Sequence, residues 1–136
     1  DFSQKLQIAL GLKKQVILCF GEKELQKNDE SLLLHLKKQL QLYSKLLGTE
    51  AAQVTLAYEP QWSIGGTQTA SITIIKKVLA LAQTFGFNHM LYGGSVDADS
   101  LKLLYFPELA GFLVGRASTN ITSLQAIFAT LKQLSV

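Results

Sequence analysis

One carboxylate, Glu59, stands between a short apolar segment and a glycine-containing loop, in the stretch AYEPQWSIGGTQTAS at residues 57–71. A carboxylate placed within reach of a substrate proton can act as a general base. A single Glu at a strand end is also commonly a solvated charge or one half of an ion pair. The role of Glu59 therefore depends on what the rest of the chain places around it.

Glycine and small polar residues follow two later apolar segments. The first turn reads GGS at residues 93–95, and the second reads GRAS at residues 115–118. Glycine lets backbone N–H groups approach an anion closely, and a helix that begins nearby adds the positive end of its dipole. These turns are compatible with a phosphate site, although paired glycines between a strand and a helix are also ordinary turn residues.

The apolar segments before these residues have the pattern of buried parallel strands. They lack polar alternation, which is typical of strands covered on both faces. The four strands are predicted at residues 15–20, 54–58, 89–92 and 111–114. Helices are predicted from apolar spacing at residues 2–10, 31–47, 69–85, 97–104 and 120–134. This alternation predicts a parallel α/β sheet, with its ligand site beyond the carboxyl ends of the strands.

Four strand–helix units could make half of a parallel (β/α)8 barrel, which typically has about 250 residues. Such a half has two open sheet edges, at residues 15–20 and 111–114, and these edges can pair with a missing partner or with another copy. The sequence begins at Asp1 and its one methionine is Met90, so we expect a segment to precede residue 1.

Several residues are expected to pack rather than to react. Cys19 is interpreted as a small core residue and Trp62 as a packing anchor, and neither His35 nor His89 is assigned a catalytic role. In the last predicted helix, five side chains are expected to face the core: Ile121, Leu124, Ile127, Phe128 and Leu131.

The composition is that of one folded domain over residues 1–136, with 48% hydrophobic and 17% charged residues. The formal net charge of +3 is spread along the chain, so we expect no nucleic-acid partner. The single cysteine fits a reducing, cytoplasmic setting, and we expect no metal and no cofactor. We also expect no membrane span, because no window reaches the roughly 18–20 apolar residues that one needs.

Taken together, four motifs resemble the triosephosphate isomerase family. AYEPQWSIG, from Ala57, is similar to the signature around the family's catalytic glutamate, and YGGSV, from Tyr92, to its phosphate-binding turn. GFLVGRAS, from Gly111, is similar to the strand and turn that complete the phosphate site, and ILCFGE, from Ile17, to the fifth-strand segment. They occur in family order, so the resemblance implies the C-terminal half of a TIM barrel, strands five to eight.

The resemblance also implies a reaction, the interconversion of dihydroxyacetone phosphate and D-glyceraldehyde 3-phosphate through an enediolate, in glycolysis and gluconeogenesis. Glu59 corresponds to the base that moves the proton, as known for this family. Residues 60–70 correspond to a lid, with hinges at residues 60–62 and 68–70. Four residues correspond to those whose backbone amides hold the substrate phosphate: Gly65, Ser95, Gly115 and Arg116.

The chain departs from the family pattern within the site. The lid reads Gly66-Thr67-Gln68 where the family usually has Thr-Gly-Lys, Gln61 replaces an aliphatic residue, and Arg116 stands where a second glycine is typical. The family's Lys, Asn and electrophilic His belong to the N-terminal half, which we expect to be missing. Each absent donor costs on the order of 3 kcal/mol of transition-state stabilisation, so the isolated chain should be nearly inactive. The complete protein is expected to be a homodimer.

Two other functions fit the same residues. A non-catalytic half-barrel that binds phosphate and associates through its open edges fits the absence of the family's Lys and His. An isomerase of a different sugar phosphate fits the presence of Arg116 and the altered lid.

Overall fold

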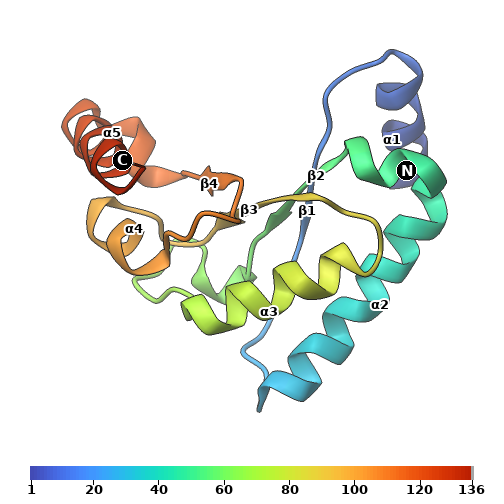
Figure 1. The fold of residues 1–136 in the computed structure, drawn as a ribbon, viewed down its shortest axis with the longest axis horizontal. Coiled ribbons are helices and arrows are strands. Elements are labelled where there is room, and N and C mark those ends of the chain that lie inside the picture. Colours follow the sequence, from blue (N-terminus) through green and yellow to red (C-terminus); the bar gives the residue numbers. More distant parts are fainter. Residues whose placement is uncertain (136) are drawn as a thin grey trace.

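The computed structural model describes residues 1–135 and contains one parallel sheet of four strands (Figure 1). The strands lie in chain order: β1 (Ile17–Phe20), β2 (Thr55–Tyr58), β3 (His89–Gly93) and β4 (Gly111–Leu113). The helices are α1 (Phe2–Gly11), α2 (Asp29–Leu47), α3 (Ile72–Gln83), α4 (Ala98–Leu104) and α5 (Ile121–Leu134). Short 3-10 helices occupy Gly48–Gln53, Gln61–Ser63 and Arg116–Thr119. The predicted parallel α/β architecture, half of a TIM barrel, is confirmed.

Neighbouring strands pair with their carboxyl ends at one edge of the sheet. Phe20 of β1 is level with Tyr58 of β2, and Tyr58 is level with Tyr92 of β3. Gly93, the last residue of β3, is level with Leu113, the last residue of β4. The loops that follow all four strands therefore leave the sheet on the same side.

Side-chain caps set where the helices begin and so limit the length of these loops. The Asn28 side chain accepts a hydrogen bond from the N–H of Ser31 at the start of α2, and Asn120 does the same for α5 through Ser123. Asp97 caps α4, and the hydrogen bond from the Ser100 N–H holds the pKa of this carboxyl below its usual value. Capping removes the cost of unpaired N–H groups at the helix ends.

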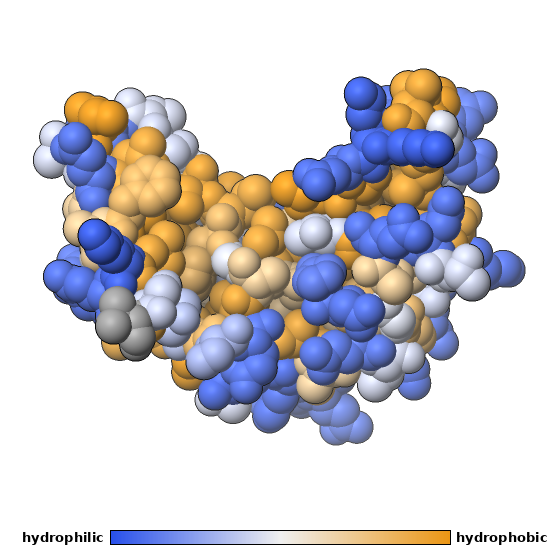
Figure 2. Space-filling model, turned by 45° about the horizontal axis from the view of Figure 1, so that its top comes forward, coloured by the Kyte–Doolittle hydropathy of each residue, from blue (hydrophilic) through white to orange (hydrophobic). Residues whose placement is uncertain are grey.

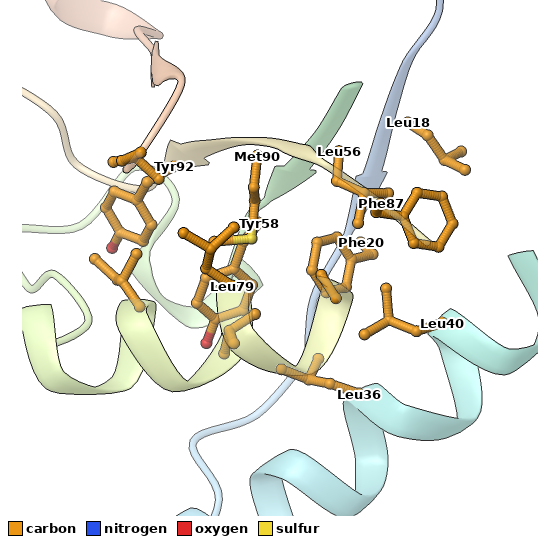
Figure 3. Packing of buried hydrophobic residues seen from close by; sticks show 14 of the residues in the cluster. Leu18, Phe20, Leu36, Leu40, Leu56, Tyr58, Leu79, Phe87, Met90 and Tyr92 are labelled. Atoms are coloured by element: carbon orange, nitrogen blue, oxygen red, sulfur yellow. The ribbon is translucent and has the colours of Figure 1, made fainter. Parts of the chain in front are cut away.

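The core lies between one face of the sheet and the helices α2 and α3 (Figure 3). Alternate strand residues point into it, and the largest buried side chains include Tyr58 and Tyr92. Helix α2 contributes Leu36 and Leu40, neither of which is exposed to solvent. Each fully buried side chain of this size contributes about 1.5–3 kcal/mol through burial.

At β1 the opposite face of the sheet is open to solvent, contrary to the prediction that both faces are covered, whereas Ala57 of β2 is buried on that face. Ile17 is 54% exposed, whereas the next residue, Leu18, is 5% exposed. The interpretation of Cys19 as a core residue is wrong, because this residue also lies exposed on the open face. Figure 2 shows a hollow, largely apolar surface between the two raised ends of the molecule. An apolar strand pattern indicates that a face can be buried, but it does not indicate which residues cover that face.

The prediction for α5 is also partly wrong. Ile121 is 69% exposed and Phe128 is 63% exposed, whereas Ile127 is buried. The helix lies at the end of the molecule and packs against α4 and the 3-10 helix Arg116–Thr119 (Figure 1). It therefore buries a narrower stripe of its surface than a helix packed across the middle of the sheet.

Substitution of Leu36 by Ala should lower the free energy of unfolding by about 2–5 kcal/mol, because it leaves a cavity beneath the sheet. Leu34 lies on the same helix and is 57% exposed, so Leu34→Ala should change the free energy by no more than about 0.5 kcal/mol. Urea denaturation followed by circular dichroism measures both values. Equal effects of the two substitutions would contradict the burial of Leu36 in the core.

Candidate functional site

Glu59 directly follows β2 and lies at the edge where the carboxyl ends of the strands meet. Its backbone N–H donates to the carbonyl oxygen of Phe20 at 2.8 Å, which continues the pairing with β1. A Cβ on Gly93 of β3 would lie 2.9 Å from both Cγ and Oε1 of Glu59. A Cβ on Gly21, which follows β1, would overlap the Glu59 carbonyl oxygen. Glycines beside both neighbouring strands therefore leave the space that Glu59 occupies.

A cavity of about 810 Å³ opens beside Glu59. The loops after β2, β3 and β4 line it, and it contains every residue that the sequence assigned to the site: Glu59, Gly65, Ser95, Gly115 and Arg116. The structure thus brings these five residues together at one rim of the sheet. Their individual roles in proton transfer and in phosphate binding stay predictions.

The backbone amides assigned to the phosphate are available for a ligand. Within residues 1–135, the N–H groups of these four residues make no hydrogen bond to another backbone group. Ser95 adopts a positive φ of 49°, a conformation that costs a residue with a side chain on the order of 1 kcal/mol. Unpaired N–H groups around a cavity are suited to a small oxyanion.

The predicted lid lies against the loops that follow β3 and β4. The Ser95 hydroxyl lies 2.6 Å from the carbonyl oxygen of Ser63 and 2.7 Å from that of Gly66, and it donates its one proton to this pair. The Arg116 guanidinium donates to the carbonyl oxygens of Gly65 and Gly66. The tip of the lid is therefore held by side chains from two different loops.

The first hinge of the lid is attached to a buried carboxylate. Trp62 Nε1 donates to Glu22 Oε1 at 2.6 Å, and the Tyr58 hydroxyl lies 3.3 Å from both oxygens of the same carboxylate. Glu22 is 1% exposed, so these donors replace the water that the carboxylate loses. Burial, followed by the charge of Glu22, raises the pKa of Tyr58. Trp62 thus combines the packing role predicted for it with a specific hydrogen bond.

The second hinge is attached to the sheet itself. The N–H of Ala70 donates to the hydroxyl oxygen of Tyr92 at 2.9 Å, and Tyr92 belongs to β3. Sequence reasoning did not single out Tyr58, Tyr92 or Ser63. A tyrosine within an apolar strand was the available signal for the first two, because a buried hydroxyl needs a partner.

Cys19 lies next to the Glu59 carboxylate, on the open face of the sheet. Partial burial, a hydrogen bond to Glu59 and the negative charge of Glu59 together raise the pKa of the Cys19 thiol to about 11. The thiol is therefore protonated at neutral pH and is a poor nucleophile. Sequence reasoning predicted no contact between the two side chains, although Cys19 lies on β1 and Glu59 directly follows the neighbouring strand β2.

The part of the chain at residues 1–135 contains no group of three or more His, Cys, Asp or Glu side chains that could hold a metal ion. None of its helices combines the length and the apolar character needed to cross a membrane.

A family model described as triosephosphate isomerase matches residues 1–131, nearly the whole chain. The chain belongs to the triosephosphate isomerase family. A triosephosphate isomerase of Wigglesworthia glossinidia brevipalpis is 30% identical over 132 residues, covering 89% of this chain and 52% of the relative. A triosephosphate isomerase of Chromohalobacter salexigens is 32% identical, covering 93% of this chain and 55% of the relative.

A third triosephosphate isomerase, from Campylobacter jejuni, is 35% identical over 112 residues and is covered over 47% of its length. The chain thus spans about half the length of the curated relatives that it matches. This proportion agrees with the four strands observed, since a complete (β/α)8 barrel of the triosephosphate isomerase family has eight.

The pKa of Cys19 allows the placement of Glu59 to be tested by alkylation. At pH 8 the thiolate should be populated in about one molecule in a thousand, against about one in four for an unperturbed cysteine. Reaction with iodoacetamide should accordingly be slow at pH 8 and should accelerate as the pH rises toward 11. Mass spectrometry measures the modified fraction over time.

Glu59→Gln provides the matched variant, because it removes the charge and keeps the side-chain size. It should lower the pKa of Cys19 and speed alkylation at pH 8. An unchanged rate in Glu59→Gln, together with a rapid reaction of the unmodified chain, would contradict the contact between the two side chains.

Proposed function

We propose that this chain carries the proton-transfer base and the phosphate-binding loops of a triose-phosphate isomerase. The reaction is the interconversion of dihydroxyacetone phosphate and D-glyceraldehyde 3-phosphate. The observation that supports it most directly is the cavity of about 810 Å³ shared by Glu59 and four residues with available amides. Membership of the triosephosphate isomerase family supports the same assignment.

The proposed role of Glu59 is to remove a proton from the hydroxyl-bearing carbon next to the substrate carbonyl, which gives the enediolate. The same carboxyl then returns a proton to the former carbonyl carbon, and a second proton passes from the hydroxyl oxygen to the carbonyl oxygen, so that the two groups exchange places. One carboxylate can serve both steps if it lies over the bond that joins the two carbons. Gly93 leaves room for the Glu59 side chain, since a Cβ at position 93 would lie 2.9 Å from both Cγ and Oε1 of Glu59.

The proposed phosphate site holds the substrate at the end away from the reacting carbons. Its donors come from the lid, through Gly65, and from the loops that contain Ser95 and Gly115. Because the lid supplies one of the donors, a bound phosphate favours the closed lid. A closed lid excludes water from Glu59 and from the enediolate, which strengthens electrostatic interactions in the site.

Stabilisation of the enediolate oxygen requires hydrogen-bond donors in addition to those of the proposed phosphate site. The lining residues include one basic side chain, Arg116, and neither Lys nor His. We propose that a further N-terminal half-barrel supplies the missing electrophilic groups, since the relatives are about twice as long as this chain. The proposal for the complete protein includes a homodimer and a cytoplasmic location.

The absence of Lys and His from the cavity lining favours one alternative, a half-barrel that binds phosphate without catalysis. The two functions differ in the isomerase activity expected of a complete barrel. An active complete barrel that depends on Glu59 supports the isomerase, whereas phosphate binding without isomerase activity in the complete barrel supports the alternative.

Glu59→Gln should lower kcat by at least about 100-fold in a complete barrel, made by joining residues 1–136 to the N-terminal half of a relative. The amide cannot accept the proton, but it keeps the shape of the site. Glu108 is exposed and lies outside the cavity, so Glu108→Gln should leave kcat within about twofold. A coupled assay for glyceraldehyde 3-phosphate measures both, and a fully active Glu59→Gln barrel would eliminate the proposed base.

A further inference from the structure

Arg116 joins two parts of the site that are about 50 residues apart in the chain. Its Nη2 donates to the carbonyl oxygen of Gly65 at 2.6 Å and to that of Gly66 at 3.2 Å. Hydrogen bonds with a charged donor are shorter and stronger than neutral ones. The side chain therefore fixes the tip of the lid to the turn that follows β4.

The rest of the guanidinium is available for an anion. A guanidinium has five N–H donors, two of them on Nη2. Within residues 1–135, both hydrogen bonds of the Arg116 side chain use Nη2, so the donors on Nε and Nη1 are uncommitted. The planar arrangement of these donors matches the oxygen spacing of a phosphate.

The backbone at position 116 permits a side chain without strain. Arg116 begins the 3-10 helix Arg116–Thr119. In the described chain, the residues other than glycine that have a positive φ are Lys13 and Ser95. Arg116 can therefore present its backbone N–H and its guanidinium to the same cavity.

The ionisable residues that line the cavity are Glu59, Asp97 and Arg116. Arg116 therefore carries the positive charge among them. An incoming phosphate dianion meets two carboxylates, and Arg116 is the cation placed to offset them. A cation among the lining residues raises the affinity of the cavity for an anion.

We propose that the Arg116 side chain couples phosphate binding to closure of the lid. It holds the lid through the carbonyl oxygens of Gly65 and Gly66, and it donates its remaining N–H groups to the phosphate that the cavity amides bind. The proposal rests on the phosphate site of the proposed function. The coupling is reciprocal: an anion that holds the guanidinium in place stabilises the closed lid, and a closed lid raises the affinity for the anion.

The test uses inorganic phosphate as the probe and the 136-residue chain as the protein, so it requires no isomerase activity. Trp62 is the single tryptophan and lies at the first hinge, so its fluorescence follows the lid during a phosphate titration. Hydrogen exchange of residues 63–68, measured by mass spectrometry with and without phosphate, reports opening of the lid tip.

Three variants separate charge from geometry. Arg116→Gly should weaken phosphate binding about tenfold and speed exchange of the lid by a similar factor, since it removes both sets of charged hydrogen bonds. Arg116→Lys keeps the charge and loses the planar set of donors. Its phosphate affinity should fall by less than about threefold, whereas exchange of its lid should be as fast as in Arg116→Gly. Arg116→Gln keeps a donor amide without the charge and should bind phosphate as weakly as Arg116→Gly.

Circular dichroism establishes that each variant is folded, and Arg116→Gln stands in for Arg116→Gly if the latter is not. Phosphate that slows lid exchange in the unmodified chain, but not in Arg116→Gly, supports the coupling. The coupling would be overturned if the unmodified chain and Arg116→Gly had equal phosphate affinity and phosphate slowed lid exchange equally in both. Failure of the unmodified chain to bind phosphate would also overturn it. An inactive complete barrel that still shows the coupling would count against the isomerase assignment alone.

Discussion

The site depends on one constraint, the parallel pairing of four strands whose carboxyl ends meet at one edge. Tyr58 and Tyr92 are level with one another, as are Gly93 and Leu113, so the loops that follow them start within one strand spacing of each other. Parallel pairing offers no other place for these loops, because each crossover helix returns the chain to the opposite edge. Residues more than 50 positions apart, such as Glu59 and Arg116, therefore line a single cavity.

The paired strands contribute side chains to the core and also support the lid. Side chains that point from β2 and β3 toward the helices are buried, but two of them, Tyr58 and Tyr92, end in hydroxyl groups. These hydroxyls reach Glu22 and the N–H of Ala70, beside the two hinges of the lid. A core made entirely of aliphatic residues would be as apolar, but it would leave the hinge groups without partners. The position of the lid is thus fixed from beneath by residues that also hold the sheet together.

The sequence predicted the order and type of the elements because long apolar runs and helical spacing are local signals. It placed β1 two residues early, at 15 rather than Ile17, since an apolar pattern does not show where pairing begins. It could not show that Cys19 and Phe128 are exposed, because exposure depends on which elements cover a face. The hydrogen bonds from Ser95 and Arg116 to the lid were also out of reach. Their acceptors are backbone carbonyls, which every residue has.

The two carboxylates that line the cavity, Glu59 and Asp97, differ in how their charges are compensated. Asp97 accepts hydrogen bonds from the N–H groups of Asp99 and Ser100, so its charge is taken up by the start of α4. Hydrogen bonds to the ionised form favour that form, in agreement with its lowered pKa. Glu59 directly follows a strand, so no helix cap compensates its charge in this way. Arg116 follows β4 and Glu59 follows β2, so the positive charge and this carboxylate reach the same cavity from different loops.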